Sequence, residues 1–184
     1  MDANVHHNAN LYSLDDISPE VEPGAGILLS RFSRERFGIT YGAVTCTVVA
    51  VVIPELEAAI LIHELPNIGP RVGDLLQEQL SELREKHPER SVDTLQSFFH
   101  IEIGPQTLRK RNASEIVEKN RRITQGIEEM LPHCQPLDPK MVKNMASSSD
   151  SSLSVLVDRV QGTVHVFPSD VVDSEGWTHL ANRS

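Results

Sequence analysis

The chain has 184 residues, 39% of them hydrophobic, which is sufficient for one domain whose core needs no disulfide bonds. Its formal net charge of −9, with no basic run interleaved with aromatic residues, disfavours a nucleic-acid-binding protein. The first residues lack the basic and then apolar pattern of a secretory signal, and no apolar run could span a bilayer, so the sequence predicts a cytoplasmic protein without membrane insertion.

The first part of the chain predicts an arm, a strand and a hairpin. Residues 1–23 are polar and show no periodicity, so we expect a flexible N-terminal arm there. A domain over residues 24–170 follows, and its first strand is expected at residues 26–30. Two apolar runs, residues 45–53 and 58–63, are separated by a short turn segment that starts with Pro54. This pattern predicts a β-hairpin.

Two amphipathic helices are expected in the middle of the chain. Apolar residues recur at helical spacing over residues 70–86, and Pro70 suits the first position of that helix. A strand is expected at residues 98–103. The second helix is predicted to begin at an Asn112 N-cap, with Glu115 three positions on, and to end near Leu131-Pro132.

The last part of the chain predicts a loop, a hairpin and a tail. Residues 135–152 contain breakers and a serine-rich run, so we expect a flexible loop that is an insertion rather than a lid. Residues 153–157 and 163–167 predict a closing hairpin, and residues 171–184 a C-terminal tail. Together these elements predict an α+β fold, a layered sandwich of mixed or antiparallel β-sheet with two main helices.

Cys46 and His63 are the candidate chemical pair. They lie at the two ends of the first predicted hairpin, so folding back of the strands brings them close to each other. A neighbouring imidazole lowers the pKa of a thiol and can protonate a leaving group. Thr40, six residues before Cys46, offers a hydroxyl that could orient the imidazole. Taken singly, Cys46 and His63 are more typical of structural roles, a small buried cysteine and a core histidine, and the structural alternative for Thr40 is a turn hydroxyl.

No metal or cofactor is predicted. The histidines form no pair at i and i+4 on a helix, and the chain has no Cys-x-x-Cys, no phosphate loop and no Gly-x-Ser-x-Gly. Cys46 and Cys134 are the two cysteines, and in a chain of this size we expect free thiols rather than a bridge. Cys134 is expected to have no chemical role.

Residues 40–46, Thr-Tyr-Gly-Ala-Val-Thr-Cys, with His63 and Pro66 beyond them, resemble the signature of the CheD family, the bacterial chemoreceptor glutamine deamidases. That family carries Thr-x-Gly-x-Gly-Ser-Cys, a strand hairpin and a His shortly before a Leu-Pro. The likeness extends over residues 24–168, and residues 118–121 resemble the family's Gly-Glu-Arg-Asn segment. It implies a CheD-like fold, Cys46 as nucleophile, His63 as base, Thr40 as its partner, a protein glutamine as substrate, chemotaxis as context and no cofactor.

Two other interpretations stay open. The segment Val44-Thr45-Cys46 and its distance from His63 also resemble the protein N-terminal asparagine amidohydrolases, which likewise release ammonia from a carboxamide. Val44 stands where the CheD signature has its second glycine, and residues 102–105 replace a glycine pair of that family. These two differences favour a non-catalytic binding module that keeps the deamidase scaffold and docks to a signalling partner protein.

Overall fold

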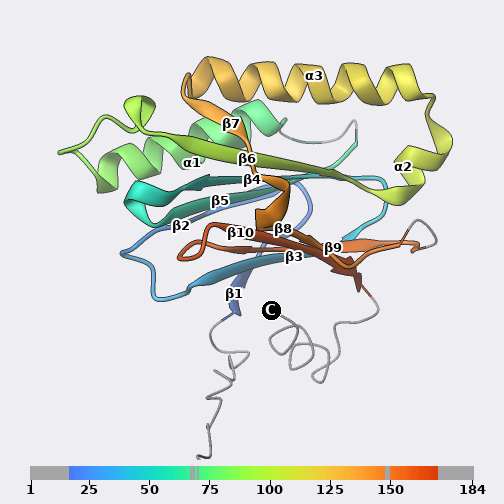
Figure 1. Ribbon diagram of the computed structural model, residues 1–184, viewed down its shortest axis with the longest axis horizontal. Helices are drawn as coiled ribbons and strands as arrows, with labels where there is room; N and C mark the ends of the chain where they lie inside the picture. The colour runs from blue at the N-terminus through green and yellow to red at the C-terminus, as the bar shows by residue number, and fades with distance from the viewer. Residues whose placement is uncertain (1–16, 67–68, 70, 148–149, 170–184) are drawn as a thin grey trace, which may run out of the picture.

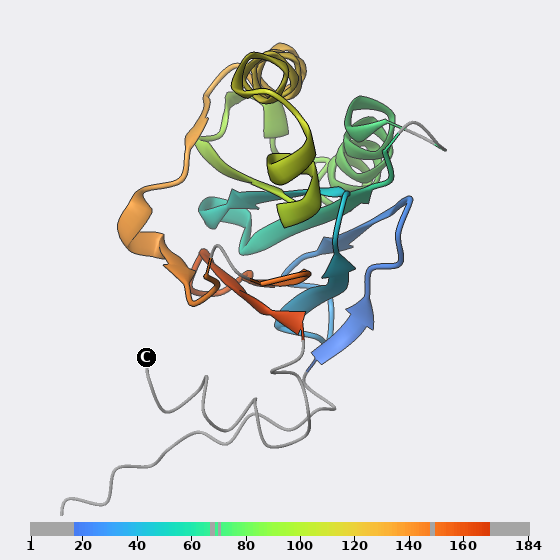
Figure 2. The ribbon, with the colours of Figure 1, turned by 90° about the vertical axis from the view of Figure 1, so that its right-hand side faces the viewer.

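The computed structural model describes residues 17–66, 69, 71–147 and 150–169, which form two β-sheets packed face to face. Two long helices cover the outer side of one sheet, as Figures 1 and 2 show. The predicted α+β sandwich with two main helices is confirmed. No described helix is long and apolar enough to cross a membrane.

Each sheet has five strands and mixes parallel with antiparallel pairs. We name each sheet after one of its strands. In order across the sheet, the β3 sheet contains β1 (Ile17–Glu20), β3 (Phe37–Ala43), β9 (Leu153–Asp158), β10 (Thr163–Pro168) and β8 (Val142–Asn144). The β4 sheet contains β2 (Ala25–Leu29), β5 (Ala58–Glu64), β4 (Thr47–Ile53), β6 (Ser97–Ile103) and β7 (Cys134–Pro136).

The helices lie on the β4 sheet. Helix α1 (Val72–Lys86) packs on β2 and β5, and α3 (Ala113–Met130) lies beside α1 and contacts β7 (Figure 2). A short helix, α2 (Pro105–Lys110), connects β6 to α3. Three 3₁₀ turns complete the described elements: η2 (Pro54–Leu56), η3 (Val92–Thr94) and η4 (Pro139–Met141).

The β4–β5 hairpin is the centre of the molecule and confirms the prediction from the two apolar runs. Every residue of both strands is buried, because the helices cover one face and the β3 sheet covers the other. Val49 and Val51 belong to the core under the helices, whereas Val48 and Ala50 belong to the core between the sheets. Burial on both faces explains why these strands are continuously apolar rather than alternating.

Both predicted helices are present. The first is observed over Val72–Lys86, and Pro70 lies outside the described residues. At the second, the Asn112 side-chain oxygen accepts a hydrogen bond of 2.9 Å from the Glu115 backbone N–H, which is the predicted N-cap. The helix then ends at Met130, next to the predicted stop.

Helix α1 supplies apolar side chains to the core, and Leu76 is completely buried there. We expect Leu76→Ala to lower the free energy of unfolding by about 2 to 5 kcal/mol, because it removes buried methyl groups and leaves a cavity. Urea denaturation measures the change. Leu108→Ala on α2, where the side chain is 46% exposed, is the matched control. Equal shifts in the two variants would contradict the packing described for α1.

Two predicted boundaries need correction. Strand β1 lies within the predicted arm of residues 1–23, pairs in parallel with β3, and leads into the buried Val21. The predicted loop of residues 135–152 contains parts of β7 and all of η4 and β8. Strands β7 and β8 have three residues each and pair in parallel at sheet edges. A run of three residues is too short to show the alternation of apolar and polar residues by which a strand is predicted. Residues 1–16, 148–149 and the tail 171–184 lie outside the described part of the chain.

Candidate active site

The structure brings Thr40 and His63 together across the two sheets. Both are completely buried, and Thr40 Oγ1 lies 2.6 Å from His63 Nδ1. The same hydroxyl donates its hydrogen to the Val21 carbonyl oxygen at 2.8 Å. A hydroxyl has one hydrogen, so Thr40 must accept the hydrogen of Nδ1–H from His63. The unprotonated lone pair of the neutral imidazole is therefore on Nε2.

His63 has the properties of a general base. Burial lowers the pKa of His63 below its usual value, so the ring is neutral at neutral pH. Nε2 is buried and has no hydrogen-bond partner among the described residues. A neutral imidazole nitrogen without a hydrogen keeps a lone pair that can accept a proton, so Nε2 is the atom of His63 that could act as a base.

Gly42 turns the chain between Thr40 and Cys46. Its φ is 69°, in the left-handed region that favours glycine, and the register of β3 against β9 shifts between Thr40 and Ala43. The backbone conformation at this position of the signature therefore favours glycine over other residues. It redirects the chain from the β3 sheet to the first residues of β4.

Cys46 immediately precedes β4, two residues before Val48, which pairs with His63. Continued alternation along the strand puts Cys46 on the same side of the β4 sheet as His63, the side that faces the β3 sheet. However, no hydrogen bond joins the thiol to Nε2. The structure thus places all three predicted residues at one end of the sandwich, and it pairs Thr40 with His63 directly.

The thiol differs from the expectation in one respect. Cys46 is only 7% exposed, and burial raises its pKa. Hydrogen bonds from Thr45 and from the Val44 backbone, and the positive charge of Lys119, oppose that rise. The expectation that the imidazole lowers the pKa of Cys46 is therefore wrong for the resting protein. The thiol is protonated at neutral pH and needs a base before it can attack.

The segment before Cys46 is held by the start of α2. Three successive carbonyl oxygens accept hydrogen bonds: Val44 from the Gln106 N–H at 3.0 Å, Thr45 from the Thr107 hydroxyl at 2.7 Å, and Cys46 from the Gly104 N–H at 2.9 Å. The backbones of Val44 and Thr45 also lie near enough to the sulfur for hydrogen bonds that lower the pKa of the thiol. Fixed N–H groups beside a nucleophile are donors of the kind that stabilise an oxyanion.

Sequence reasoning missed the role of Gly104. The predicted strand of residues 98–103 ends just before this glycine, and no pattern gives the glycine a further role, yet a Cβ at this position would lie 2.5 Å from the backbone C and O of Val44. No residue except glycine fits at this distance. The one sequence signal was the Gly-Pro pair itself, which marks a break but does not reveal the distant contact.

We expect Gly104→Ala to lower the free energy of unfolding by about 3 kcal/mol, since the added methyl meets backbone atoms that cannot rotate away. Gly126→Ala in α3 is the matched control, because a Cβ there meets nothing within 4 Å. The control should instead raise the stability by up to about 1 kcal/mol through helix propensity. Thermal and urea denaturation measure both, and equal stabilities would contradict the close packing at Gly104.

We expect alkylation of Cys46 by iodoacetamide to have a midpoint pH above that of an ordinary thiol, because burial disfavours the thiolate. The raised pKa means that the thiolate fraction is small at neutral pH and grows only as pH rises through the higher value. Mass spectrometry of Cys134→Ser, in which Cys46 is the remaining thiol, gives the rate at each pH. A midpoint at or below that of free cysteine would contradict this expectation.

The remaining observations limit what the site can hold. Both cysteines are free and buried, and no group of three or more His, Cys, Asp or Glu side chains within the described ranges could hold a metal ion. A cavity of about 550 Å³ lies between α1 and α3, and neither Thr40, Cys46 nor His63 lines it. Comparison with protein-family models and with curated proteins gives no match. A functional assignment therefore has to come from the geometry around His63.

Proposed function

We propose that this protein is a cysteine-dependent amidohydrolase that deamidates a glutamine side chain of a protein substrate through a thioester intermediate. The observation that supports this best is the hydrogen-bond chain from His63 Nδ1 through Thr40 Oγ1 to the Val21 carbonyl, which leaves Nε2 unprotonated and without a partner. A neutral imidazole with a free Nε2 on the same side of the sheet as a thiol is the arrangement that nucleophilic catalysis by cysteine needs.

The proposed reaction has two halves. In the first, Nε2 of His63 takes the thiol proton of Cys46, the sulfur forms a bond to the amide carbon, and the imidazolium returns the proton to departing ammonia. In the second, Nε2 takes a proton from water, whose oxygen attacks the thioester carbon, and the proton goes to the departing sulfur. The N–H groups of Val44 and Thr45 stabilise the oxyanion of each tetrahedral intermediate, each donor contributing about 3 kcal/mol.

The proposal includes a CheD-like scaffold, a cytoplasmic location and a place in chemotactic signalling. The two-sheet sandwich with helices on one side supports the scaffold part, as does the position of the Thr-x-Gly segment at the turn between Thr40 and Cys46. No cofactor enters the reaction, because the attacking atom, the base and the oxyanion donors all belong to the chain.

The direct test is deamidation in isotopically labelled water. Candidate proteins and glutamine peptides are incubated with the protein, and each deamidated site should gain about 1 Da in ordinary water and about 3 Da in H₂¹⁸O, with one ammonia released. The label must enter because water supplies the new oxygen when the thioester breaks. Deamidation without uptake of the label would contradict the proposed route.

An N-terminal asparagine is the second candidate substrate, supported by the same thiol and imidazole. Peptides that begin with Asn, with their N-acetylated counterparts as matched controls, separate the two candidates. Turnover of the free N-terminal peptides alone would favour the N-terminal amidohydrolase. Turnover of internal glutamine would favour the protein glutamine deamidase.

A non-catalytic module that docks to a signalling protein is the third candidate. The low exposure of Cys46, 7%, and the lack of a hydrogen bond from its thiol to Nε2 favour it. Such a module releases no ammonia and introduces no label into its partner. It would, however, bind its partner with the same affinity after Cys46→Ser.

A further inference from the structure

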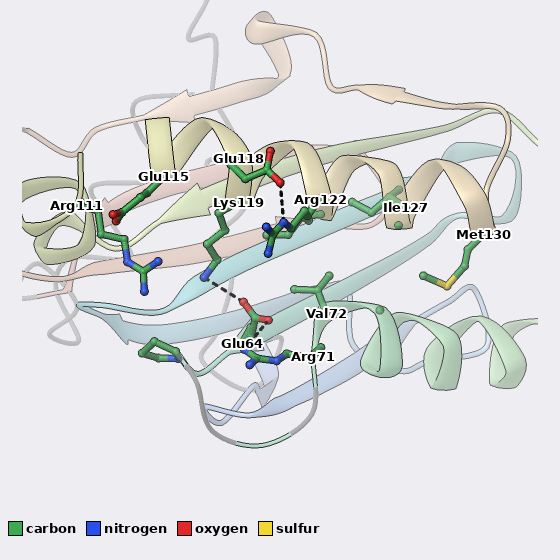
Figure 3. A pocket seen from close by; sticks show the side chains of 14 residues that line it. Glu64, Arg71, Val72, Arg111, Glu115, Glu118, Lys119, Arg122, Ile127 and Met130 are labelled. Atoms are coloured by element: carbon green, nitrogen blue, oxygen red, sulfur yellow. Dashed lines mark hydrogen bonds and ion pairs between the residues drawn. The ribbon is translucent and has the colours of Figure 1, made fainter. Parts of the chain in front are cut away.

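The cavity between α1 and α3 has a charged half and an apolar half. Figure 3 shows Arg111, Lys119 and Arg71 around Glu64 at one end, where α3 begins, with Val72, Ile127 and Met130 toward the other. Its volume of about 550 Å³ is within the range of sites that hold small molecules or peptide side chains. A single small anion would leave most of it empty.

The carboxylates of the charged half are already paired. Glu64, which is 5% exposed, forms ion pairs with Lys119 at 3.2 Å and with Arg71 at 3.8 Å. Glu118 accepts a hydrogen bond of 2.7 Å from Arg122. Glu115 accepts one of 3.2 Å from the Asn112 amide at the N-cap of α3.

Arg111 is different from the other cations of the cavity. Its guanidinium points over the cavity toward Lys119 and Glu64 in Figure 3 and has no hydrogen bond or ion pair with any described residue. Glu64 is shared by two cations, and no ion pair joins Glu115, which accepts from the neutral Asn112 amide, to Arg111. The lining contains four cations, Arg71, Arg111, Lys119 and Arg122, against the three carboxylates of Glu64, Glu115 and Glu118. This excess of positive charge occurs in a chain whose net charge is −9. A planar guanidinium with unused donors is suited to bind a carboxylate through two parallel hydrogen bonds.

The charged half of the cavity lies on the helix side of the β4 sheet, at the end where β4 begins, whereas Cys46, which precedes β4, is on the opposite side of that sheet. Glu64 pairs in register with Thr47, the residue after Cys46, and the hydroxyl of Thr47 is buried without a hydrogen-bond partner. The charge of Lys119 is near enough to lower the pKa of Cys46. A peptide held in the cavity would therefore lie beside the start of β4, and Cys46 is the residue before that start.

We propose that this cavity binds a peptide segment with an acidic side chain and a neighbouring apolar one. The carboxylate pairs with Arg111, and the apolar side chain enters the half lined by Val72, Ile127 and Met130. The assignment of this segment to the substrate rests on the proposed function. Binding of the segment in the cavity is independent of the proposed function.

The test uses Cys46→Ser protein and a series of fluorescent heptapeptides, each with one Gln, one Leu and one Glu. The Gln and the Leu keep their positions throughout the series, and the Glu is moved through all the remaining positions. A second series replaces Glu by the uncharged Gln. Fluorescence anisotropy should show that at least one acidic peptide binds about fivefold more tightly than its uncharged counterpart, and that Arg111→Gln removes the difference. Arg111→Lys should restore part of it.

Lys110→Gln is the matched control, since Lys110 is adjacent and the variant changes the net charge equally, but it does not line the cavity. That variant should keep the preference. Absence of binding by every acidic peptide at millimolar concentration, or an equal loss in both variants, would overturn the proposal, as would binding of inorganic phosphate with no peptide preference. Ammonia release by the wild-type protein that is independent of the acidic residue overturns the assignment of the bound segment to the substrate and leaves the proposed function intact. Acidic-peptide binding without ammonia release from any substrate overturns the proposed function alone.

Discussion

Cys46→Ser is expected to lower ammonia release by at least about a thousandfold, because a serine hydroxyl is far less acidic than a thiol and His63 is a weak base. The serine oxygen is slightly smaller than the cysteine sulfur and the two side chains have the same shape, so the fold should tolerate serine at this buried position. Ammonia release and product mass are measured on the same substrate for both proteins. Circular dichroism confirms that the fold is retained.

The other cysteine gives the control for this result. Cys134 is 6% exposed in β7, belongs to the core under the helices, and has no place in the proposed reaction. Cys134→Ser should therefore keep its turnover even if its stability falls. Equal losses in Cys46→Ser and Cys134→Ser would show that the effect comes from the fold, and full activity of Cys46→Ser would remove Cys46 as nucleophile.

Thr40→Val is expected to lower turnover about a hundredfold, because the variant cannot accept the hydrogen of His63 Nδ1–H. Without that acceptor, the imidazole is free to place its hydrogen on Nε2, where it can no longer take the thiol proton. The loss should lie in kcat rather than KM, because Thr40 is buried and positions the base without touching the substrate. Steady-state kinetics over a range of pH measures it.

Thr40→Ser separates orientation of the base from packing. Serine keeps the hydroxyl that links the Val21 carbonyl to the imidazole but lacks the methyl group, so it should keep most of the activity. Both variants should lose stability, and denaturation measures how much. If Thr40→Ser were as inactive as Thr40→Val, the packing of the methyl group rather than the hydrogen bond would control the reaction.

Local patterns predicted the elements whose signals are contained within one stretch of sequence. The Asn112 N-cap, the apolar face of α1 around Leu76 and the β4–β5 hairpin are of this kind, since each depends on residues a few positions apart. Strand β1 could not be predicted in this way. It is defined by parallel pairing with β3, and nothing inside Ile17–Glu20 announces that partner.

The same distinction applies to the site. His63 and Thr40 are 23 residues apart and belong to different sheets, so their contact was an expectation from a motif rather than from any periodicity. The contact of Gly104 with Val44 joins segments still farther apart in the chain, and no pattern around either residue reports it. The burial of Cys46 depends on contacts with segments distant in the chain, such as the start of α2 that bonds its carbonyl, and it raises the thiol pKa where a nearby imidazole was expected to lower it.

The register of the central hairpin has a consequence for insertions and deletions in its turn. His63 and Glu64 are consecutive, yet one faces the space between the sheets and the other the space under the helices. Adding or removing a single residue in η2 would exchange these two environments, exposing the imidazole to Lys119 and the carboxylate to Thr40. The length of the turn therefore determines whether His63 faces the β3 sheet or the helices. Inserting or deleting two residues would leave His63 facing the β3 sheet, whereas inserting or deleting one would not.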